Sequence, residues 1–422
     1  MRKTLKSLPF LGVLAVLALA GCSLGPTALK SGRTTYNVAL QRSANEQILL
    51  NLVRLKYREP TSFIEIGSIS ASSSFSLGAT VSNIQPNSGN QSATAAGSAG
   101  YSETPTITYS PLQGEQFAKR LMSELDIKTF LLLLRAGWNP SRLMRLTVEH
   151  LGELDNDPTL KPLAGEQETA YTRFVKFTKL LTDLHMKGAL HFGLGPGKAV
   201  RIGEAVQKEG LKPAEIIAAN KDGYDLLPHK EGAVEIVKAG PPSLVIEANP
   251  SEAERAELSD YLKFSAERRP QHVAESQSVL FYLGKGPMEE PVELPLQLRS
   301  YHVVLYYLAQ GIEVPTADID KGYVKTHWRG PNESAGVTWE DWRKATVDLL
   351  DVRCSLLPPR GAFVSVEYRG HWFYIDDSDI KSKDTFALLY LIFALEAGEV
   401  PSMLPILTIP VSGPVSAPAV VR

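Results

Sequence analysis

Residues 69–81 follow a strict two-residue alternation, and few folds accommodate such a pattern. Successive side chains of a β-strand point to opposite faces of the sheet, so a period of two predicts a strand. One face is mainly apolar and the other carries hydroxyl groups or glycine: Ile69, Ala71, Ser73, Phe75, Leu77, Ala79 and Val81 alternate with Ser70, Ser72, Ser74, Ser76, Gly78 and Thr80.

The same parity returns over 95–109, after a stretch at 83–94 that is rich in Asn, Ser, Gly and Gln. Two strands that flank a polar turn predict one long Ser/Gly/Ala-rich β-hairpin with matched faces. Thirteen residues at about 3.3 Å each reach roughly 43 Å, which at a tilt of about 45° covers roughly 30 Å. The apolar band of an outer membrane is about 25 Å tall, so the hairpin is long enough to cross it.

Two interpretations of this hairpin stay open. Either its apolar face packs on the rest of the protein, or it enters a membrane within a ring that takes one hairpin from each subunit. A ring is required because an isolated hairpin in lipid leaves its edge N–H and C=O groups unpaired. Glu103 on the apolar face, Pro105 in the second strand and the modest hydrophobicity of Ala and Gly favour packing on the protein.

The N-terminus has the three parts of a secretion signal. They are, in order, the basic residues Arg2, Lys3 and Lys6, an apolar run over 8–19, and the small residues Ala20 and Gly21. The apolar run is too short to span a bilayer permanently. The stretch Leu19-Ala20-Gly21-Cys22 then resembles the lipobox of bacterial lipoproteins, and this resemblance covers only the N-terminal residues.

The resemblance implies that residues 1–21 are removed and that Cys22 becomes acylated on its thiol and its new amino group. Each buried methylene contributes about 0.8 kcal/mol, so two or more chains hold a protein on a membrane stably. Ser23, in place of the Asp that signals inner-membrane retention, implies a periplasm-facing outer-membrane address if the host is Gram-negative. The alternative is an ordinary signal peptide that leaves a free thiol at Cys22.

The composition of the chain limits which partners it can bind and which disulfides it can form. Removal of residues 1–21 takes away three of 44 basic residues and none of 46 acidic ones, which leaves a mildly acidic chain. An acidic chain is a poor candidate for nucleic-acid binding. Cys22 and Cys354 are the two cysteines, so a lipidated Cys22 leaves Cys354 without an intrachain disulfide partner. Its apolar neighbours predict a buried structural thiol.

The rest of the pattern predicts an α+β fold, with helices around small, mostly antiparallel sheets. A capping box at Ser43 and Glu46 predicts the start of one helix, and others are expected over 113–125, 129–135, 166–186, 251–264, 296–308, 339–350 and 385–395. Strands are expected within 190–202 and over 233–238, 243–248, 362–368, 372–375 and 403–411. Residues 142–151 fit either structure.

These elements group into successive regions along the chain. We expect a signal peptide at 1–21, a tether at 22–35, a helix plus the hairpin at 36–110 with its tip at 83–94, a helical α+β middle region at 111–290, a C-terminal α+β region at 291–411 and a disordered tail at 412–422.

A glycine-rich stretch holds Gly193, Gly195, Gly197 and Lys198, but its spacing differs from that of a phosphate-binding loop. Phe192 takes the place of the first glycine, and Ala199 takes the place of the metal-binding hydroxyl. We therefore expect a glycine-rich hairpin turn and no cofactor site.

The carboxylates Asp376, Asp377 and Asp379 suit either acid–base or Ca²⁺ chemistry, or the capping of a helix. They precede a predicted helix, where its backbone amides favour Asp, so we expect capping. The eight histidines lack metal-binding spacing, and no catalytic serine motif occurs. The sequence therefore predicts no catalytic, metal-binding or cofactor-binding residue.

The run Arg369-Gly370-His371-Trp372-Phe373-Tyr374 is rich in side chains that make interfaces. It forms either a binding surface or a strand whose alternate residues Trp372 and Tyr374 face the core. We favour the second interpretation.

These observations favour a non-catalytic envelope component, anchored on the outer membrane through Cys22, that assembles with itself or with protein partners. A hairpin pore or an export-complex subunit is the bolder form. The alternatives are an enzyme acting on an envelope polymer, with Asp376 and Asp377 in its site, and a monomeric periplasmic module that binds a ligand.

Overall fold

The computed structural model describes residues 24–82, 94–159, 168–195, 200–201, 206–207, 212–221, 224–228, 233–238, 240, 242–263, 277–284, 291–328, 337–397 and 407–410. The expected signal peptide at 1–21, Cys22 and the expected tail at 412–422 lie outside the described residues. So do residues 83–93 of the tip expected at 83–94, whereas Thr94 begins a strand. The chain divides into two compact units. Unit 1 comprises Met1–Pro60 and Leu121–Glu396, and unit 2 comprises Thr61–Arg120 and Ala397–Arg422.

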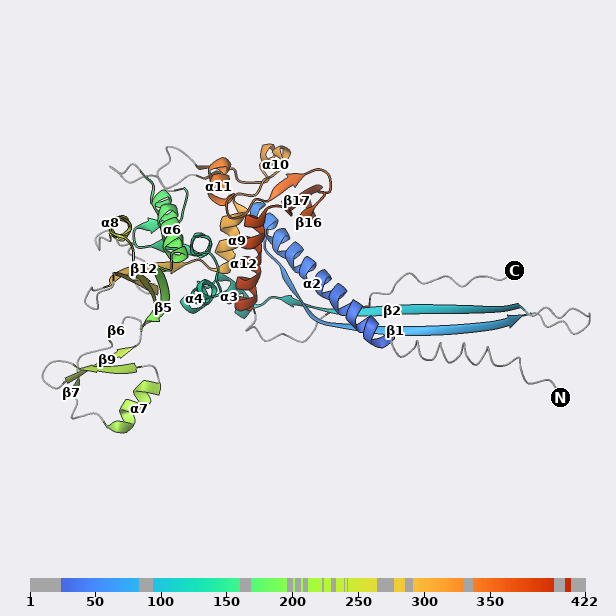
Figure 1. Ribbon diagram of the computed structural model, residues 1–422, viewed down its shortest axis with the longest axis horizontal. Helices are drawn as coiled ribbons and strands as arrows, with labels where there is room; N and C mark the ends of the chain where they lie inside the picture. The colour runs from blue at the N-terminus through green and yellow to red at the C-terminus, as the bar shows by residue number, and fades with distance from the viewer. Residues whose placement is uncertain are drawn as a thin grey trace, which may run out of the picture. The chain divides into compact units, whose positions relative to one another are not determined.

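The fold is α+β, as predicted (Figure 1). Its helices are α2 (Leu24–Lys56), α3 (Glu115–Met122), α4 (Ile127–Arg135), α5 (Pro140–Thr147), α6 (Ala170–Met186), α7 (Pro213–Lys221), α8 (Glu252–Tyr261), α9 (Tyr301–Ala309), α10 (Thr316–Asp320), α11 (Trp339–Thr346) and α12 (Ile380–Ala397).

The largest sheet of unit 1 has the strand order β4-β3-β12-β11-β10-β5. Its strands are β3 (Val148–Leu151), β4 (Leu154–Asp155), β5 (Leu190–Gly195), β10 (Ser243–Ala248), β11 (Gln277–Leu283) and β12 (Val292–Leu298). Only β10 and β11 pair in parallel within this sheet, so the prediction of mostly antiparallel sheets is confirmed.

Three smaller sheets complete the strands described in unit 1. One has the order β15-β17-β16, and another pairs β13 with β14, while β6, β7 and β8 all pair with β9. These strands are β6 (Val200–Arg201), β7 (Val206–Gln207), β8 (Tyr224–Pro228), β9 (Ala233–Lys238), β13 (His327–Trp328), β14 (Val337–Thr338), β15 (Arg353–Ser355), β16 (Ala362–Tyr368) and β17 (His371–Asp376).

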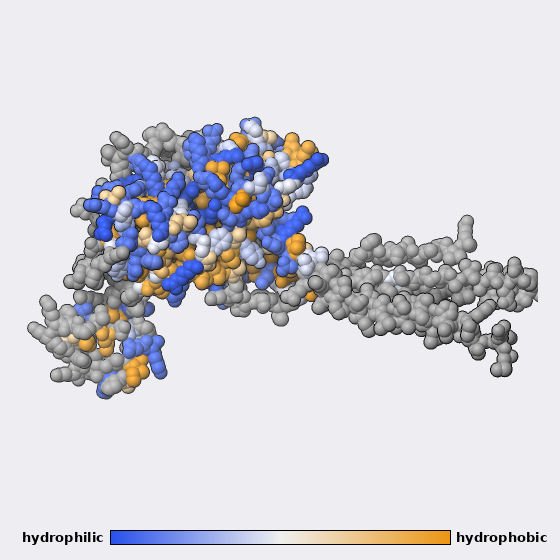
Figure 2. Space-filling view, viewed as in Figure 1, coloured by the Kyte–Doolittle hydropathy of each residue, from blue (hydrophilic) through white to orange (hydrophobic). Residues whose placement is uncertain are grey.

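The core of unit 1 forms where amphipathic helices cover the large sheet. The buried face of α6 includes Phe174 and Phe177, and the Phe177 ring lies 5.9 Å from that of Phe281 on β11. This helix lies within the range 166–186 that the sequence predicts. Hydrophobic and hydrophilic side chains are interspersed on the visible face of unit 1 (Figure 2).

Unit 2 is built on the predicted hairpin. Its strands β1 (Phe63–Ser82) and β2 (Thr94–Leu112) run antiparallel and side by side (Figure 1). The short strand β18 (Leu407–Pro410) pairs with β2, and the sheet order is β1-β2-β18. The expected C-terminal strand at 403–411 is thus confirmed over the residues that the structure describes.

Helix α2 begins at Leu24, so the expected tether at 22–35 is helical from residue 24 and Ser43 lies inside the helix. A Ser–x–x–Glu pattern marks a helix start only where the preceding residues cannot continue the helix. Pro26 is tolerated because it lies in the first turn. The residues that follow contain no further proline, so nothing ends the helix before Lys56.

The described strands on either side of the glycine-rich stretch do not pair with each other, so the prediction of a hairpin turn between them was wrong. Gly193 and Gly195 lie within β5, which pairs with β10, whereas β6 pairs with β9 in another sheet. A Cβ atom on Gly195 would lie 2.8 Å from Cγ2 of Val245, so close packing explains this glycine. Gly197, Lys198 and Ala199 lie outside the described residues.

The buried helix expected over 296–308 is a strand followed by a helix. Leu294, Leu296 and Leu298 are buried at alternate positions of β12, and α9 starts only after Ser300, whose side chain accepts a hydrogen bond from the Val303 amide. The alternation carried a strand signal that the helical interpretation overlooked. The ambiguous stretch 142–151 similarly contains both α5 and β3.

Candidate functional site

The β1–β2 hairpin brings the two predicted alternations into register. Among the paired positions, Ile69 faces Ile107 and Phe75 faces Tyr101, whereas Ser74 faces Ser102 on an intervening row. From Ile69 onward, odd positions of β1 therefore face odd positions of β2, and these rows are mainly apolar. Even positions face even positions, and these rows are rich in hydroxyl groups. The prediction of matched faces is confirmed by this pairing.

A β-bulge at Gly67 extends the apolar face beyond the predicted segment. The pairing shifts between Ile66 and Ser68, so that Ile66 faces Tyr109 while Ile69 faces Ile107. One extra residue in a strand reverses the parity of everything before it. Ile66 therefore shares a face with the odd positions that follow, although its own number is even.

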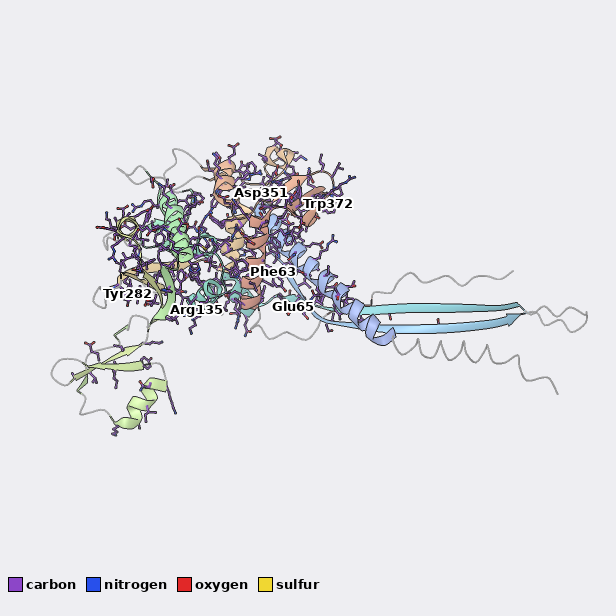
Figure 3. The ribbon with its side chains drawn as sticks, in the orientation of Figure 1. Phe63, Glu65, Arg135, Tyr282, Asp351 and Trp372 are labelled. Atoms are coloured by element: carbon purple, nitrogen blue, oxygen red, sulfur yellow. The ribbon has the colours of Figure 1, made fainter. Side chains whose placement is uncertain are left out.

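Side-chain packing within unit 2 holds the base of the hairpin. Phe63 is 2% exposed, and its ring lies 6.0 Å from the ring of Phe117 on α3. Thr108 and Ser110 on β2 are also buried. Phe63 and the exposed Glu65 lie at the start of β1 (Figure 3). The hairpin is thus fixed at the end from which β1 starts.

The two outer edges of the hairpin differ in what covers them. Among the described strands, none pairs with the outer edge of β1. On the outer edge of β2, β18 pairs with the four residues from Thr106 to Tyr109. Unpaired backbone N–H and C=O groups along a strand are a template for another strand. The hairpin therefore presents two long edges, and each can accept a further strand.

The sequence features that opposed membrane insertion occupy two adjacent odd-numbered rows. Glu103 faces Ser73, and Pro105 faces Ala71. The four rows from Phe75 to Val81 on the side of the tip contain no charged residue and no proline. Glu103 and Pro105 therefore lie nearer the base of the hairpin, and the apolar and small residues between them and the tip form an uninterrupted block.

The interface-like run at 369–374 forms the β16–β17 hairpin, but our favoured assignment of its faces was wrong. Phe373 and Ile375 face the core, whereas Trp372 and Tyr374 are half-buried on the opposite side of the sheet. Trp372 is labelled in Figure 3. The parity is set by the residue that follows α2, because the centre of the Tyr57 ring lies 6.3 Å from that of the Phe373 ring.

Two arginines near this hairpin adopt backbone conformations that usually require glycine. Arg58 has a φ of 63° and Arg369 a φ of 52°, and they are the two non-glycine residues with positive φ in the described chain. The Arg369 guanidinium lies 4.3 Å from the ring centre of Tyr323, and that of Arg58 lies 5.1 Å from the ring centre of Tyr306. Cation–π contacts therefore accompany both strained sites.

The three carboxylates at the end of β17 and just after it form hydrogen bonds or ion pairs with nearby residues. Asp379 accepts hydrogen bonds from the amide and hydroxyl of Ser382, which caps α12 as predicted. Asp376 accepts from the amide of Ser378, and Asp377 pairs with Lys383 at 2.8 Å. In the described ranges, no group of three His, Cys, Asp or Glu residues is arranged to hold a metal ion.

The remaining titratable candidates do not assemble into a reaction centre. His150 Nδ1 lies 3.0 Å from Asp155, and although burial opposes it, this carboxylate raises the histidine pKa. Cys354 is a half-buried free thiol whose pKa burial raises to about 12. At neutral pH such a thiol is protonated and a weak nucleophile, and it is less buried than predicted.

Buried cations in unit 1 lie at the C-terminal ends of helices. Arg145, 8% exposed, donates to the Ala345 carbonyl at the end of α11. Arg299, 4% exposed, donates to the carbonyls of Arg145 and Leu146 at the end of α5. Carbonyls in the last helical turn lack intrahelical partners, and the helix dipole favours positive charge there. These charges therefore have a structural explanation.

The comparisons with known proteins identify no relative. No protein-family model, curated protein or solved structure matches this chain. No helix in the described parts of the chain is long and apolar enough to cross a membrane. Among the described residues, the paired rows of the β1–β2 hairpin are the feature that most resembles an interaction site.

Proposed function

We propose that this chain is a lipid-anchored component of the cell envelope that works by self-assembly through its β1–β2 hairpin. Its anchor is Cys22 after removal of residues 1–21, and its address is the periplasmic side of the outer membrane. The observation that carries the proposal is the register of the hairpin, in which odd positions form a continuous, mainly apolar face over 69–81.

The physics of a two-stranded ribbon supports assembly. A lone hairpin is marginally stable in water, and three or more strands or a packed face are needed for independent stability. In the described structure, β18 adds a third strand over only four residues of β2. The long remainder of the hairpin gains stability when further strands join its edges and when its apolar face leaves water.

The bolder form of the proposal is a ring of hairpins that crosses the membrane. The apolar rows then face lipid, the Ser, Thr and Gly rows face the interior, and ring closure pairs every edge. Phe75 and Tyr101 are paired across the strands, and the next odd-numbered row toward the base contains Glu103. Aromatic positions at a membrane boundary followed by a charge outside it fit this orientation.

The test is the native mass of the mature lipoprotein extracted from membranes in mild detergent. We expect a defined oligomer, and we expect deletion of 69–109 to convert it to a monomer. A monomeric full-length protein would remove both forms of the proposal. An oligomer that survives the deletion would move the assembly surface to unit 1.

A pair of point variants separates the apolar face from general damage to the hairpin. Leu77→Asp places a charge on the apolar face, and Ser76→Asp places the same charge on the hydroxyl face of the adjacent row. We expect Leu77→Asp to abolish the oligomer and Ser76→Asp to retain it. Equal loss in both variants would contradict a role for the apolar face.

The anchor has its own experiment. Cys22→Ser removes the thiol that the lipobox presents, so we expect loss of label from radioactive palmitate and release of the protein from the membrane fraction. Cys354→Ser is the matched control, because it removes the other cysteine and should leave the label unchanged. Label that persists in Cys22→Ser would refute the lipoprotein assignment.

A further inference from the structure

We propose that the two outer edges of the hairpin are the two halves of one interface between copies of this chain. The outer edge of β1 in one copy pairs with the outer edge of β2 over 94–104 in the next. This inference rests on the proposed function and deepens it, because it names the partner of the hairpin and the backbone that joins them.

The chain itself demonstrates that the β2 edge accepts a strand. Leu407, Thr408 and Ile409 of β18 face Tyr109, Thr108 and Ile107 in an antiparallel ladder. Leu407 and Ile409 are paired with odd positions of β2, and Thr408 is paired with a threonine. An added strand therefore continues the pattern of the hairpin when it keeps this parity.

The β1 edge lacks the features that normally prevent pairing between molecules. Edge strands are usually protected by lysine, proline or short length. β1 is 20 residues long, contains no proline or lysine, and carries Glu65 as its single charged residue. Glu65 lies at the base, so the stretch from Ser68 to Ser82 has no charge to oppose an incoming strand.

A second copy of the chain is the partner that fits both edges. β1 and β2 share one alternation, so β2 of one copy, over 94–104, meets β1 of the next with the same two faces. Because β1 and β2 run antiparallel, repetition of the hairpin in one direction pairs each β2 with the next β1 antiparallel. A partner selected by charge finds only Glu65 and Glu103 on these strands.

β18 sets the lower limit of this interface. It covers β2 from Thr106 to Tyr109, and Pro105, which has no N–H to donate, is the first residue beyond it. A neighbouring β1 therefore reaches β2 only between Thr94 and Thr104. The C-terminal strand thereby restricts the contact between copies to the half of the hairpin that is nearer the tip.

The experiment is disulfide mapping between two differently tagged full-length copies that are expressed together, each with Cys354→Ser. One copy carries Ser74→Cys on β1, and the other carries one cysteine on β2, at Ala96, Ser98, Ser102 or Thr104. We expect cross-links between the two tags at one or two neighbouring positions of this even-numbered row. Ala99→Cys lies on the opposite face and should not cross-link.

Two controls test whether the hairpin is formed and whether β18 blocks pairing. Ser74→Cys and Ser102→Cys within one chain occupy facing positions and should close an internal disulfide, which verifies that the hairpin is formed. Ser70→Cys in one copy with Thr108→Cys in the other tests the part of β2 that β18 covers, and no link between tags is expected there.

The outcomes distinguish this inference from the proposed function. A detergent-stable oligomer without cross-links between tags at any even position would overturn the edge pairing while self-assembly stands. Cross-links at Thr108→Cys as strong as those nearer the tip would overturn the role of β18. A monomer that closes the internal disulfide would refute both, because the hairpin would then be folded and unpaired.

Discussion

Lys56 at the end of α2 donates from Nζ to the carbonyl oxygen of Gln310 at the end of α9, across 2.6 Å and 254 residues of sequence. The side chain is 2% exposed. Burial, with a smaller contribution from the charge of Arg58, lowers the pKa of Lys56 to about 7. The contact thus ties two helix ends together at the cost of a desolvated amine.

This shift predicts that the protein becomes more stable as the pH rises above neutral. Between pH 7 and 10.5 the unfolded chain keeps a proton on Lys56 that the folded protein has lost. Unfolding free energy rises with pH wherever the unfolded state binds more protons, here by up to about 1.4 kcal/mol per pH unit. Urea unfolding at pH 7, 8.5 and 9.5 measures the rise.

Lys56→Met should flatten that rise, and Lys344→Met is the control because Lys344 is 77% exposed. The two variants are compared with the unsubstituted protein over the same three pH values. Parallel pH profiles for Lys56→Met and the unsubstituted protein would show that the buried amine is not the cause.

Removal of the Arg299 guanidinium should be among the costliest substitutions in unit 1. Arg299 donates to the carbonyls of Arg145, Leu146 and Asn156, and its guanidinium lies 3.9 Å from the ring centre of Tyr307. Arg299→Met leaves the buried carbonyls of Leu146 and Asn156 without that donor, whereas the Arg145 carbonyl keeps a hydrogen bond from Asn156 Nδ2. A buried unsatisfied group costs about 1–3 kcal/mol. We expect a loss of roughly 3–5 kcal/mol in urea unfolding.

Arg299→Lys should recover only part of this loss, since a single ammonium cannot reproduce the planar fork of the guanidinium. Arg135→Met is a suitable control because Arg135 is exposed and makes one hydrogen bond of 3.5 Å. A loss in Arg135→Met as large as that in Arg299→Met would count against a specific role for the buried fork.

At Arg369, backbone strain destabilises the folded protein and cation–π contacts stabilise it. Its φ of 52° costs a residue with a Cβ about 1–2 kcal/mol, whereas its contacts with tyrosine rings contribute about 0.5–1 kcal/mol at an exposed site. Arg369→Gly removes both terms, so we expect a net change within about 1 kcal/mol. Arg369→Ala keeps the strain, and thermal unfolding should rank it below Arg369→Gly.

The local signals in the sequence predicted the structure well where one short segment determines its own conformation. β9 and β10 have the predicted bounds, and the helix expected from residue 251 begins there as α8, with a capping box of Ser251 and Glu254. The turn at Arg369 and Gly370 also lies where two strands were expected to meet, and both residues have positive φ. In each case neighbouring side chains or backbone geometry are sufficient.

The errors arose where distant parts of the chain decide the outcome. Which face of β17 is buried depends on Tyr57, which precedes it by more than three hundred residues. The glycine at 195 is explained by Val245 on another strand, and the cover of β2 by β18 joins segments that sequence periodicity cannot connect. The sequence showed the alternation along the hairpin, but it did not show which strand pairs with each edge of the hairpin.

Gly311 provides the sharpest test of packing in unit 1. A Cβ atom at this position would lie 1.8 Å from Oγ1 of Thr346, and that hydroxyl is held by its hydrogen bond to the Trp342 carbonyl. Thr346 is fully buried, so the clash cannot be relieved by turning the side chain into solvent. We expect Gly311→Ala to destabilise the protein by roughly 2–4 kcal/mol in urea unfolding.

The double variant Gly311→Ala with Thr346→Ala identifies the cause of that loss. Removal of the hydroxyl and methyl leaves the Thr346 Cβ as the nearest atom, at 3.0 Å from the added carbon. The double variant should therefore be more stable than the sum of the single losses predicts, with a coupling of about 1–2 kcal/mol. Additive losses would show that the clash with Thr346 is not the cause of the loss in Gly311→Ala.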